Sequence, residues 1–379
     1  HAIAKELQSV LIGQRLGKAY QLGTTDLYLD FRLRDGRSLM ISTDPQRLAI
    51  YLTSRSIKQF AAQPRIDTNF VLLIKKYLSG AQVAGLEHLG YDRVVHINFQ
   101  AEDEAGHKKS RTLIVELTGP SANVLIVEEG RIIAELRERK SEAQAEEHID
   151  EIATSAETIK LYTDPEPPTN KLDPFDCPPE KLHAIIEQSS GLVAAAARKY
   201  LIGFGPLYAQ ELTARAKTQP PEMALQSLLN DLFNRELSPR VYSSAPLAEM
   251  REQIGADNFA VVFSPIDLIH QTGRVLTYFE SINEAADATF TLLDERARFA
   301  TTKQQLSSNL SARLKKQRTL LSKLKQESER FARDEQAQRF GELLLANAHH
   351  AAKVDDVFLV TDYYDPEQAT IEIPSAESA

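Results

Sequence analysis

The hydrophobic positions at the start of the chain change from a helical period to a strand period. Apolar residues recur at helical spacing over residues 2–11, whereas residues 27–33 alternate between apolar and polar side chains. The Asp35-Gly36 pair then marks a tight turn, and the alternation resumes over residues 39–41. The pattern therefore predicts a helix followed by a β-hairpin.

The next segment continues this mixture of helix and strand. Residues 68–78 have helical spacing, and Thr68 or Asn69 suits the N-terminal cap of that helix. Short β-type runs separated by polar turns follow at residues 93–99, 111–117, 123–127 and 131–136. The simplest packing is a meander of antiparallel strands with one or two helices on it, so the predicted fold class is α+β.

A linker and a helical module come next. Residues 137–179 are first charged and then rich in proline, which prevents a regular element in the second part. Residues 180–217 have helical spacing that is broken at Gly203-Phe204-Gly205. This order is typical of a helix-hairpin-helix, whose turn presents backbone N–H groups to a phosphate, here at Gly203 and Gly205. An ordinary αα-corner is the alternative, and the sequence by itself favours the αα-corner.

Strand-like runs return after the helical module. Residues 258–264 and 274–279 have the composition of strands. We expect this pair to complete the sheet of the first domain, so that the helical module is an insertion between two parts of that domain. A small β element is expected near the end, at residues 357–360 and 370–373.

Residues 296–326 form a basic segment in an acidic chain. They contain nine Lys or Arg residues and no Asp or Glu, although the formal net charge of the chain is -9. No proline occurs between Pro265 and Pro366, so a long helix is predicted. A charge run is usually a solvated helix face, but charge of a single sign favours a phosphate-binding surface. The candidate RNA-binding residues are Arg313, Lys315, Lys316, Arg318, Lys323 and Lys325.

The same segment carries one apolar seam. Leucines recur at spacings of three, four and seven residues, at Leu306, Leu310, Leu314, Leu321 and Leu324. Gln317 interrupts the seam, so the pattern predicts a modest coiled coil. An exposed apolar stripe usually finds a partner, and we expect this chain to self-associate through the seam.

Composition narrows the possible classes of protein. The 379 residues suffice for two or three domains, and no apolar run approaches the length of a membrane span. We therefore expect no membrane partner. Cys177 is the single cysteine, which excludes an internal disulfide and a cysteine zinc site and suits a cytoplasmic location. The histidines show no metal-ligand spacing, so neither a metal nor another cofactor is expected.

Asp92 and Arg93 are the pair with the clearest chemical potential. They follow Gly90 at the start of a predicted strand, where a loop would project them. An arginine offers a planar fork to a phosphate or a base edge, and an aspartate orients that fork or accepts from a base amine. The alternative is a surface ion pair worth about 0–1 kcal/mol, and the residues by themselves favour that alternative.

Five short strings in this order resemble the NFACT family of ribosome-associated quality-control factors. They are GYDRV at 90–94, GPSAN at 119–123, GFGPLYA at 203–209, GELLLAN at 341–347, and YYDP at 363–366 followed by IEIP at 371–374. The resemblance implies an N-terminal domain related in fold to formamidopyrimidine-type DNA glycosylases, formed by residues 1–175 and 246–288. It also implies a helix-hairpin-helix domain at residues 176–245 and a truncated coiled-coil arm with a small β tip at residues 289–379.

The resemblance further implies a non-enzymatic RNA binder with no catalytic residue. In this family the pair that matches Asp92 and Arg93 is needed for tRNA-dependent tailing, and Asn123 of the GPSAN string is assigned to tRNA binding with them. The implied partners are the large ribosomal subunit, a tRNA and the stalled nascent chain–tRNA complex. The implied task is template-independent addition of C-terminal alanine, with tRNA-Ala as the expected tRNA.

Two other functions remain alternatives. A DNA-processing enzyme on the glycosylase fold would need an N-terminal proline amine, whereas the chain reads HAIAKE over residues 1–6, and one cysteine cannot build the zinc finger of those enzymes. A surface adhesin that binds host matrix, as the older name of the bacterial members suggests, would need secretion, and no secretory signal is recognised.

Overall fold

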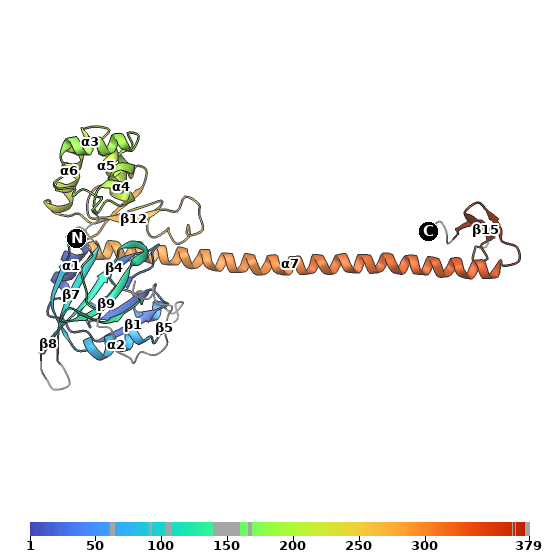
Figure 1. Cartoon of the computed structure of the whole chain (residues 1–379), viewed down its shortest axis with the longest axis horizontal. Coiled ribbons are helices and arrows are strands. Elements are labelled where there is room, and N and C mark those ends of the chain that lie inside the picture. Colours follow the sequence, from blue (N-terminus) through green and yellow to red (C-terminus); the bar gives the residue numbers. More distant parts are fainter. Residues whose placement is uncertain are drawn as a thin grey trace, which may run out of the picture. The chain divides into compact units, whose positions relative to one another are not determined.

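The computed structural model of the chain describes residues 1–60, 65–90, 93–102, 108–138, 160–165, 169–365, 367 and 369–375. These residues divide into two compact units, His1–Arg298 and Phe299–Ala379. The predicted α+β class is confirmed, since the first unit combines β-sheets with a bundle of helices (Figure 1).

Two antiparallel five-stranded sheets form the β part of the first unit. The first has the order β4-β3-β2-β1-β5, and the second has the order β10-β9-β8-β7-β6. Strands of the first sheet are β1 (Lys18–Leu22), β2 (Asp26–Asp30), β3 (Ser38–Ser42), β4 (Ala49–Thr53) and β5 (Arg65–Ile66). Strands of the second are β6 (Gln82–His88), β7 (Val94–Glu102), β8 (Lys108–Glu116), β9 (Asn123–Glu128) and β10 (Arg131–Glu135).

The hydrophobic core of this part lies between the two sheets and two helices. Helices α1 (Ala2–Leu11) and α2 (Asn69–Leu78) contribute buried side chains to the same cluster as both sheets. Thr68 caps α2 by accepting a hydrogen bond from the Val71 N–H, as predicted. The predicted hairpin is confirmed as well, because β2 pairs with β3 and places Leu29 opposite Leu39.

In these two sheets, strands β1, β4, β5 and β6 were not predicted, and burial gives the reason for β4. All five residues of β4 are buried. One face of the first sheet contributes to the main core, and the other, including Tyr28, Met40 and Tyr51, packs against Ala286 of α7 (Ile282–Ala346). A strand covered on both faces has no polar side, so the alternation that reveals a half-buried strand is missing.

Glu6 of α1 holds the N-terminus of α7. Its carboxylate accepts hydrogen bonds from the backbone N–H groups of Ile282 and Asn283, at 2.8 and 3.1 Å. It also accepts from the Ser281 hydroxyl at 2.7 Å and from the Asn283 side-chain amide at 2.8 Å. A carboxylate at this position satisfies otherwise unpaired donors and complements the helix dipole.

Replacing Glu6 with Ala is expected to lower the free energy of unfolding by about 2–3 kcal/mol, because several donors at the start of α7 lose a charged acceptor. Urea titration followed by circular dichroism measures this change. Glu284→Ala is the matched control, since Glu284 lies in the same helical turn and is exposed. A Glu6→Ala variant as stable as that control would contradict this role.

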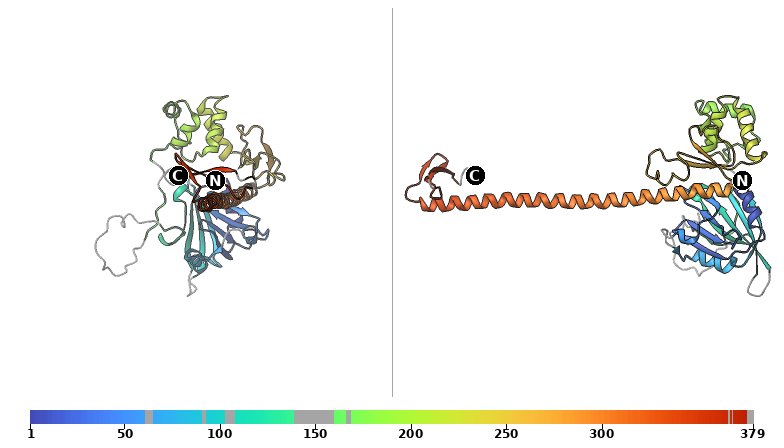
Figure 2. Two further views of the ribbon diagram at one scale, coloured as in Figure 1. Left: turned by 90° about the vertical axis from the view of Figure 1, so that its right-hand side faces the viewer. Right: turned by 180° about the vertical axis from the view of Figure 1, so that it is seen from behind.

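The helical module contains α3 (Pro179–Gln188), α4 (Val193–Tyr200), α5 (Pro206–Arg215) and α6 (Pro221–Phe233). Leu182, Leu212 and Leu228 belong to its separate core. Both views of the ribbon place this bundle on one side of β12 (Val261–Ser264) and the five-stranded sheets on the other (Figure 2). The helices expected in this segment are confirmed.

The predicted completion of the first sheet by residues 258–264 and 274–279 is wrong. Strands β12 and β13 (Val275–Tyr278) flank β11 (Arg240–Ser243) in a separate three-stranded sheet. They do not pair with one another, because each is hydrogen-bonded to β11. The contact with the first sheet is made by side chains instead, since Phe263 packs against the cluster that contains Tyr28 and Met40.

The predicted linker at residues 137–179 falls partly outside the described residues. Within its described part, which ends where α3 begins, no helix or extended strand forms, but two short anchors do. Leu161 forms a β-bridge with Arg131, and Leu172 forms one with Leu201. These bridges attach the segment to the second sheet and to the helical module.

The second unit contains the larger part of α7 and a small sheet. Strands β14 (Ala352–Val354), β15 (Val357–Thr361) and β16 (Thr370–Pro374) pair in that order, which confirms the predicted β element. Leu343 of α7 packs with Val360 and Ile373 and forms the core of this end. Asn347 connects helix and sheet, because its amide donates to the carbonyl of Thr361 at 3.0 Å.

The leucine seam of α7 is exposed, as predicted. Its five leucines have fractional exposures between 53% and 62%. We therefore expect light scattering to detect self-association that rises with concentration. A Leu310→Glu, Leu314→Glu variant should remain monomeric, whereas Ala312→Glu with Thr319→Glu, on the opposite side of the helix, should not. A chain that is monomeric at every accessible concentration would contradict this expectation.

Candidate nucleic-acid interface

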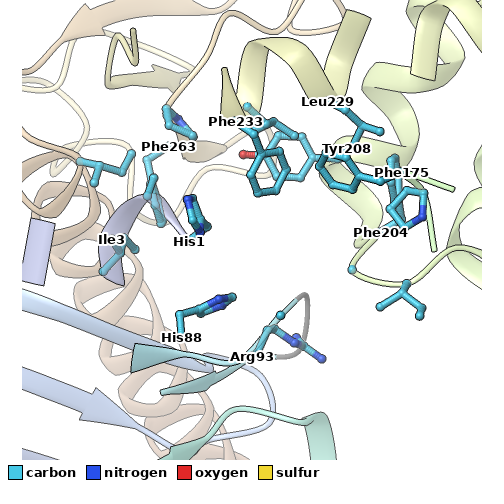
Figure 3. Close-up of a pocket in the computed structure, with 18 residues that line it drawn as sticks. His1, Ile3, His88, Arg93, Phe175, Phe204, Tyr208, Leu229, Phe233 and Phe263 are labelled. Carbon is cyan, nitrogen blue, oxygen red and sulfur yellow. The ribbon is translucent and has the colours of Figure 1, made fainter. Parts of the chain in front are cut away.

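A cavity of about 320 Å³ lies within the first unit, where α1, the start of β7 and the helical module meet. Figure 3 shows His88 and Arg93 on the side of the strands and Tyr208 and Phe233 on the side of the helices. The aromatic lining residues are His1, His88, Phe175, Phe204, Tyr208, Phe233 and Phe263. Flat apolar walls with a guanidinium among the lining groups suit an unpaired base or another planar group.

Arg93 is exposed and lines this cavity. Gly90 precedes it with a φ of 48°, a backbone conformation that favours glycine. The ends of the loop are joined by a hydrogen bond of 3.1 Å from the Leu89 N–H to the Val94 carbonyl. The Leu117 N–H donates to the carbonyl of Arg93 itself at 2.8 Å. Asp92, the predicted partner of Arg93, lies outside the described residues.

His88 supplies an uncharged polar group to the cavity. Burial lowers the pKa of His88 to about 4, so the imidazole is neutral at pH 7. Its ring lies 5.9 Å from that of His1, measured between centroids. A neutral imidazole offers one donor and one acceptor, which suits the edge of a base.

The predicted phosphate-binding turn lies at the same cavity. Gly203 has a φ of 78°, which favours glycine, and it lines the cavity with Phe204. Gly205 is the N-cap residue of α5. No side chain forms a capping hydrogen bond at this end of the helix. The N-terminus of α5 therefore presents backbone N–H groups and the positive end of the helix dipole. Phosphate binding at Gly203 and Gly205 stays a prediction.

The assignment of Asn123 to tRNA binding is corrected by its surroundings. Asn123 is 2% exposed. Its side-chain amide donates to the carbonyl of Arg137 at 2.8 Å, and its side-chain oxygen accepts from the N–H groups of Val124 and Arg137, each at 2.9 Å. Both polar atoms are thus used to join β9 to the segment after β10, and Asn123 has a structural role.

The basic residues of α7 belong to the second unit. All six predicted RNA-binding residues are exposed: Arg313, Lys315, Lys316, Arg318, Lys323 and Lys325. Exposure leaves their charges available to a polyanion, and the single sign of the segment distinguishes it from the mixed charge of an ordinary solvated helix.

Sequence reasoning did not find the aromatic walls of the cavity. Phe204 could have been predicted as a site residue, because it lies between the two glycines of the Gly203-Phe204-Gly205 turn. Phe175, Phe233 and Phe263 come from a loop, a helix end and a strand that only the tertiary structure brings together.

Within the described part of the chain, no helix is both long and apolar enough to cross a membrane.

Comparisons with known proteins agree with this architecture. A family model described as "NFACT N-terminal and middle domains" matches residues 1–378. The chain is 27% identical over 385 residues to the "Rqc2 homolog RqcH" of Streptococcus pneumoniae (D39) and 24% identical over 384 residues to that of Bacillus subtilis. Each match covers 99% of this chain and 62% of the relative, so the chain spans about three-fifths of these relatives.

Two solved structures share the fold. A fibrinogen binding protein from Staphylococcus aureus has a TM-score of 0.56 at 18% identity, covering 76% of this chain and 95% of that one. The N-terminal part of the fibronectin/fibrinogen-binding protein from Streptococcus suis has a TM-score of 0.52 at 20% identity, covering 77% and 97%. Because the family model matches nearly every residue, from the β-sheets to the end of the small terminal sheet, this chain belongs to the NFACT family.

Proposed function

We propose that this chain acts in ribosome quality control in the cytoplasm. It would bind obstructed large ribosomal subunits that carry peptidyl-tRNA and recruit a tRNA, tRNA-Ala, for template-independent C-terminal tailing of the stalled nascent chain. The names of relatives at 24–27% identity support the general role. The finer assignment rests on the site.

The observation that carries the proposal is the position of Arg93. It lines the same aromatic cavity as Gly203 at the turn before α5, although the two residues come from different folded parts of the first unit. A guanidinium, stacking surfaces and a helix N-terminus together match the charge and planarity of an unpaired nucleotide. The exposed basic residues of α7 would add sequence-independent phosphate contacts.

We propose no catalytic residue for this chain. Peptide-bond formation would be performed by the ribosome, and the protein would position the tRNA. Glu6, the acidic residue nearest the start of the chain, is engaged in hydrogen bonds at the start of α7, so its carboxylate is not free to serve as a general acid or base. This engagement favours positioning over the alternative of a DNA-processing enzyme. The likeness to matrix-binding proteins is a likeness of fold and does not support an adhesin.

Co-sedimentation tests the proposal directly. The full-length protein is expected to sediment with large subunits that carry peptidyl-tRNA and much less with empty subunits. Adding tRNA-Ala should increase the bound fraction, because the tRNA and the subunit would be held together. Equal sedimentation with empty and occupied subunits, unaffected by tRNA, would exclude this function.

A further inference from the structure

A short segment outside the second five-stranded sheet pairs with β10, the edge strand of that sheet. Residues 160–162 lie against the start of β10, where the Tyr162 N–H donates to the Gly130 carbonyl at 2.8 Å. The Ile132 N–H donates back to the carbonyl of Lys160 at 2.9 Å. These two bonds fix the backbone at Tyr162, so its side chain has a defined place over the sheet.

The phenol of Tyr162 reaches across the sheet to a buried carboxylate. Tyr162 packs against the apolar cluster that contains Val94 and Leu89. Its hydroxyl donates to Glu116 Oε1 at 3.2 Å, and Glu116 is 2% exposed. Burial and the neighbouring carboxylates of Glu116 and Asp164 raise the pKa of Tyr162, so the hydroxyl keeps its proton at neutral pH.

His96 extends the same cluster on β7. Its ring lies 5.9 Å from that of Tyr162, and its Nε2 lies 3.2 Å from Asp164 Oδ1. Tyr162 and Asp164 therefore both contact the face of β7 that also bears Val94. This face is the one opposite the main core, because Val95 and Ile97 point to that core.

The apolar cluster against which Tyr162 packs also includes the two residues that close the loop before Arg93. Leu89 and Val94 are joined by the hydrogen bond that ends the loop. Val94 also pairs in register with Glu116, the acceptor of the Tyr162 hydroxyl. The Leu117 N–H then holds the carbonyl of Arg93. Tyr162 is thus linked to both sides of the position from which Arg93 projects, through the shared apolar cluster and through Glu116.

We propose that Tyr162 is a positioning residue for Arg93, acting through Leu89, Val94 and Glu116. This proposal rests on the proposed tRNA-binding function of Arg93. A contact that needs a side chain in a defined orientation is weakened when the backbone at its base becomes mobile. Tyr162 reduces that mobility without touching the bound nucleotide.

A double-mutant cycle separates this role from a general effect on stability. In the full-length protein, Tyr162→Ala is expected to lower the affinity for a tRNA-Ala transcript about tenfold. In an Arg93→Gln background the same substitution should change the affinity less than about twofold, because the side chain it positions is gone. Equal losses in the two backgrounds would overturn the proposal, since they would show that Tyr162 acts independently of Arg93.

Hydrogen exchange distinguishes failure of this proposal from failure of the proposed function. Tyr162→Ala should speed exchange of the Leu89 and Leu117 amides about tenfold, because both bonds lie at the base of the loop. Unchanged exchange would refute the positioning role of Tyr162. If exchange rises but Arg93→Gln leaves tRNA binding intact, then Tyr162 orders the loop and the function assigned to Arg93 is wrong.

Two further variants keep the test decisive. If Tyr162→Ala does not fold, Tyr162→Phe takes its place, because it retains the ring and removes only the hydrogen bond to Glu116. We expect Tyr162→Phe to lower tRNA affinity and to speed exchange of the Leu89 and Leu117 amides in the same direction, by smaller factors. Tyr363→Phe is the matched control, because it removes a tyrosine hydroxyl that donates to Asn347 at 3.3 Å in the second unit. The control should alter neither the exchange of Leu89 and Leu117 nor the affinity for tRNA-Ala.

Discussion

Replacing Asp92 and Arg93 together with Ala is expected to abolish alanine addition by the full-length protein while changing its total affinity for RNA by roughly 1–3 kcal/mol at most. Phosphate contacts hold a nucleic acid, whereas contacts to base edges select it. Arg93 lines the cavity, and under the proposed function its guanidinium makes a contact of this selecting kind. Losing it should therefore remove selection of the tRNA more completely than it removes binding.

The measurement combines a tailing assay on obstructed large subunits with filter binding of tRNA-Ala and a non-cognate tRNA. Asp67→Ala with Lys75→Ala is the matched control, because it removes another acid–base pair, 3.2 Å apart, from the surface of the same unit. The control should tail at the normal rate. If the Asp92, Arg93 variant also tails normally, the functional assignment of this pair is wrong.

Replacing Arg313, Lys315, Lys316 and Arg318 with Gln is expected to weaken ribosome binding and to flatten its dependence on salt. Each lost phosphate contact should reduce the log–log slope by about 0.7–0.9. Glutamine is a good helix former, so α7 should remain intact. Selection between tRNAs should not change, because these residues are exposed on a helix and would contact only the backbone of RNA.

Binding of large subunits measured at several salt concentrations tests this expectation. Glu327→Gln with Glu329→Gln provides the control, since both residues are exposed on the same helix and carry the opposite charge. That control should bind at least as tightly as the unaltered protein. An unchanged slope in the four-residue variant would mean that residues 296–326 are only a solvated helix face.

Elements with a local signature were predictable from sequence. The hairpin between β2 and β3 is encoded by alternating residues around Asp35-Gly36, and its register follows from the turn. The long helix α7 follows from a sustained helical period without proline, in which Gly341 is the single glycine, and the same period exposes its leucine seam. Arg93 was found as a candidate because it follows a glycine at a strand start.

The tertiary structure decided what depends on contacts between distant residues. Asn123 had the same motif-based support as Arg93. Its side chain, however, is hydrogen-bonded to the backbone carbonyl and N–H of Arg137. Tyr162 lies in a segment that the sequence describes only as a linker, and its contact with Glu116 spans the sheet. Neither outcome has a periodic or compositional signal, because both depend on which backbone groups lie nearby after folding.

The chain's sequence alone determined an α+β protein with a basic, leucine-lined helix and a glycine turn between two helices. Only the tertiary structure showed that Arg93 and Gly203 line one cavity and that β12 and β13 belong to a sheet separate from the first. It also showed that Glu6 accepts hydrogen bonds from the first residues of α7. Local sequence patterns predict whether a segment is a helix or a strand and which of its faces is apolar. Sites form where several elements converge, and that convergence is set by the burial of side chains far apart in the chain.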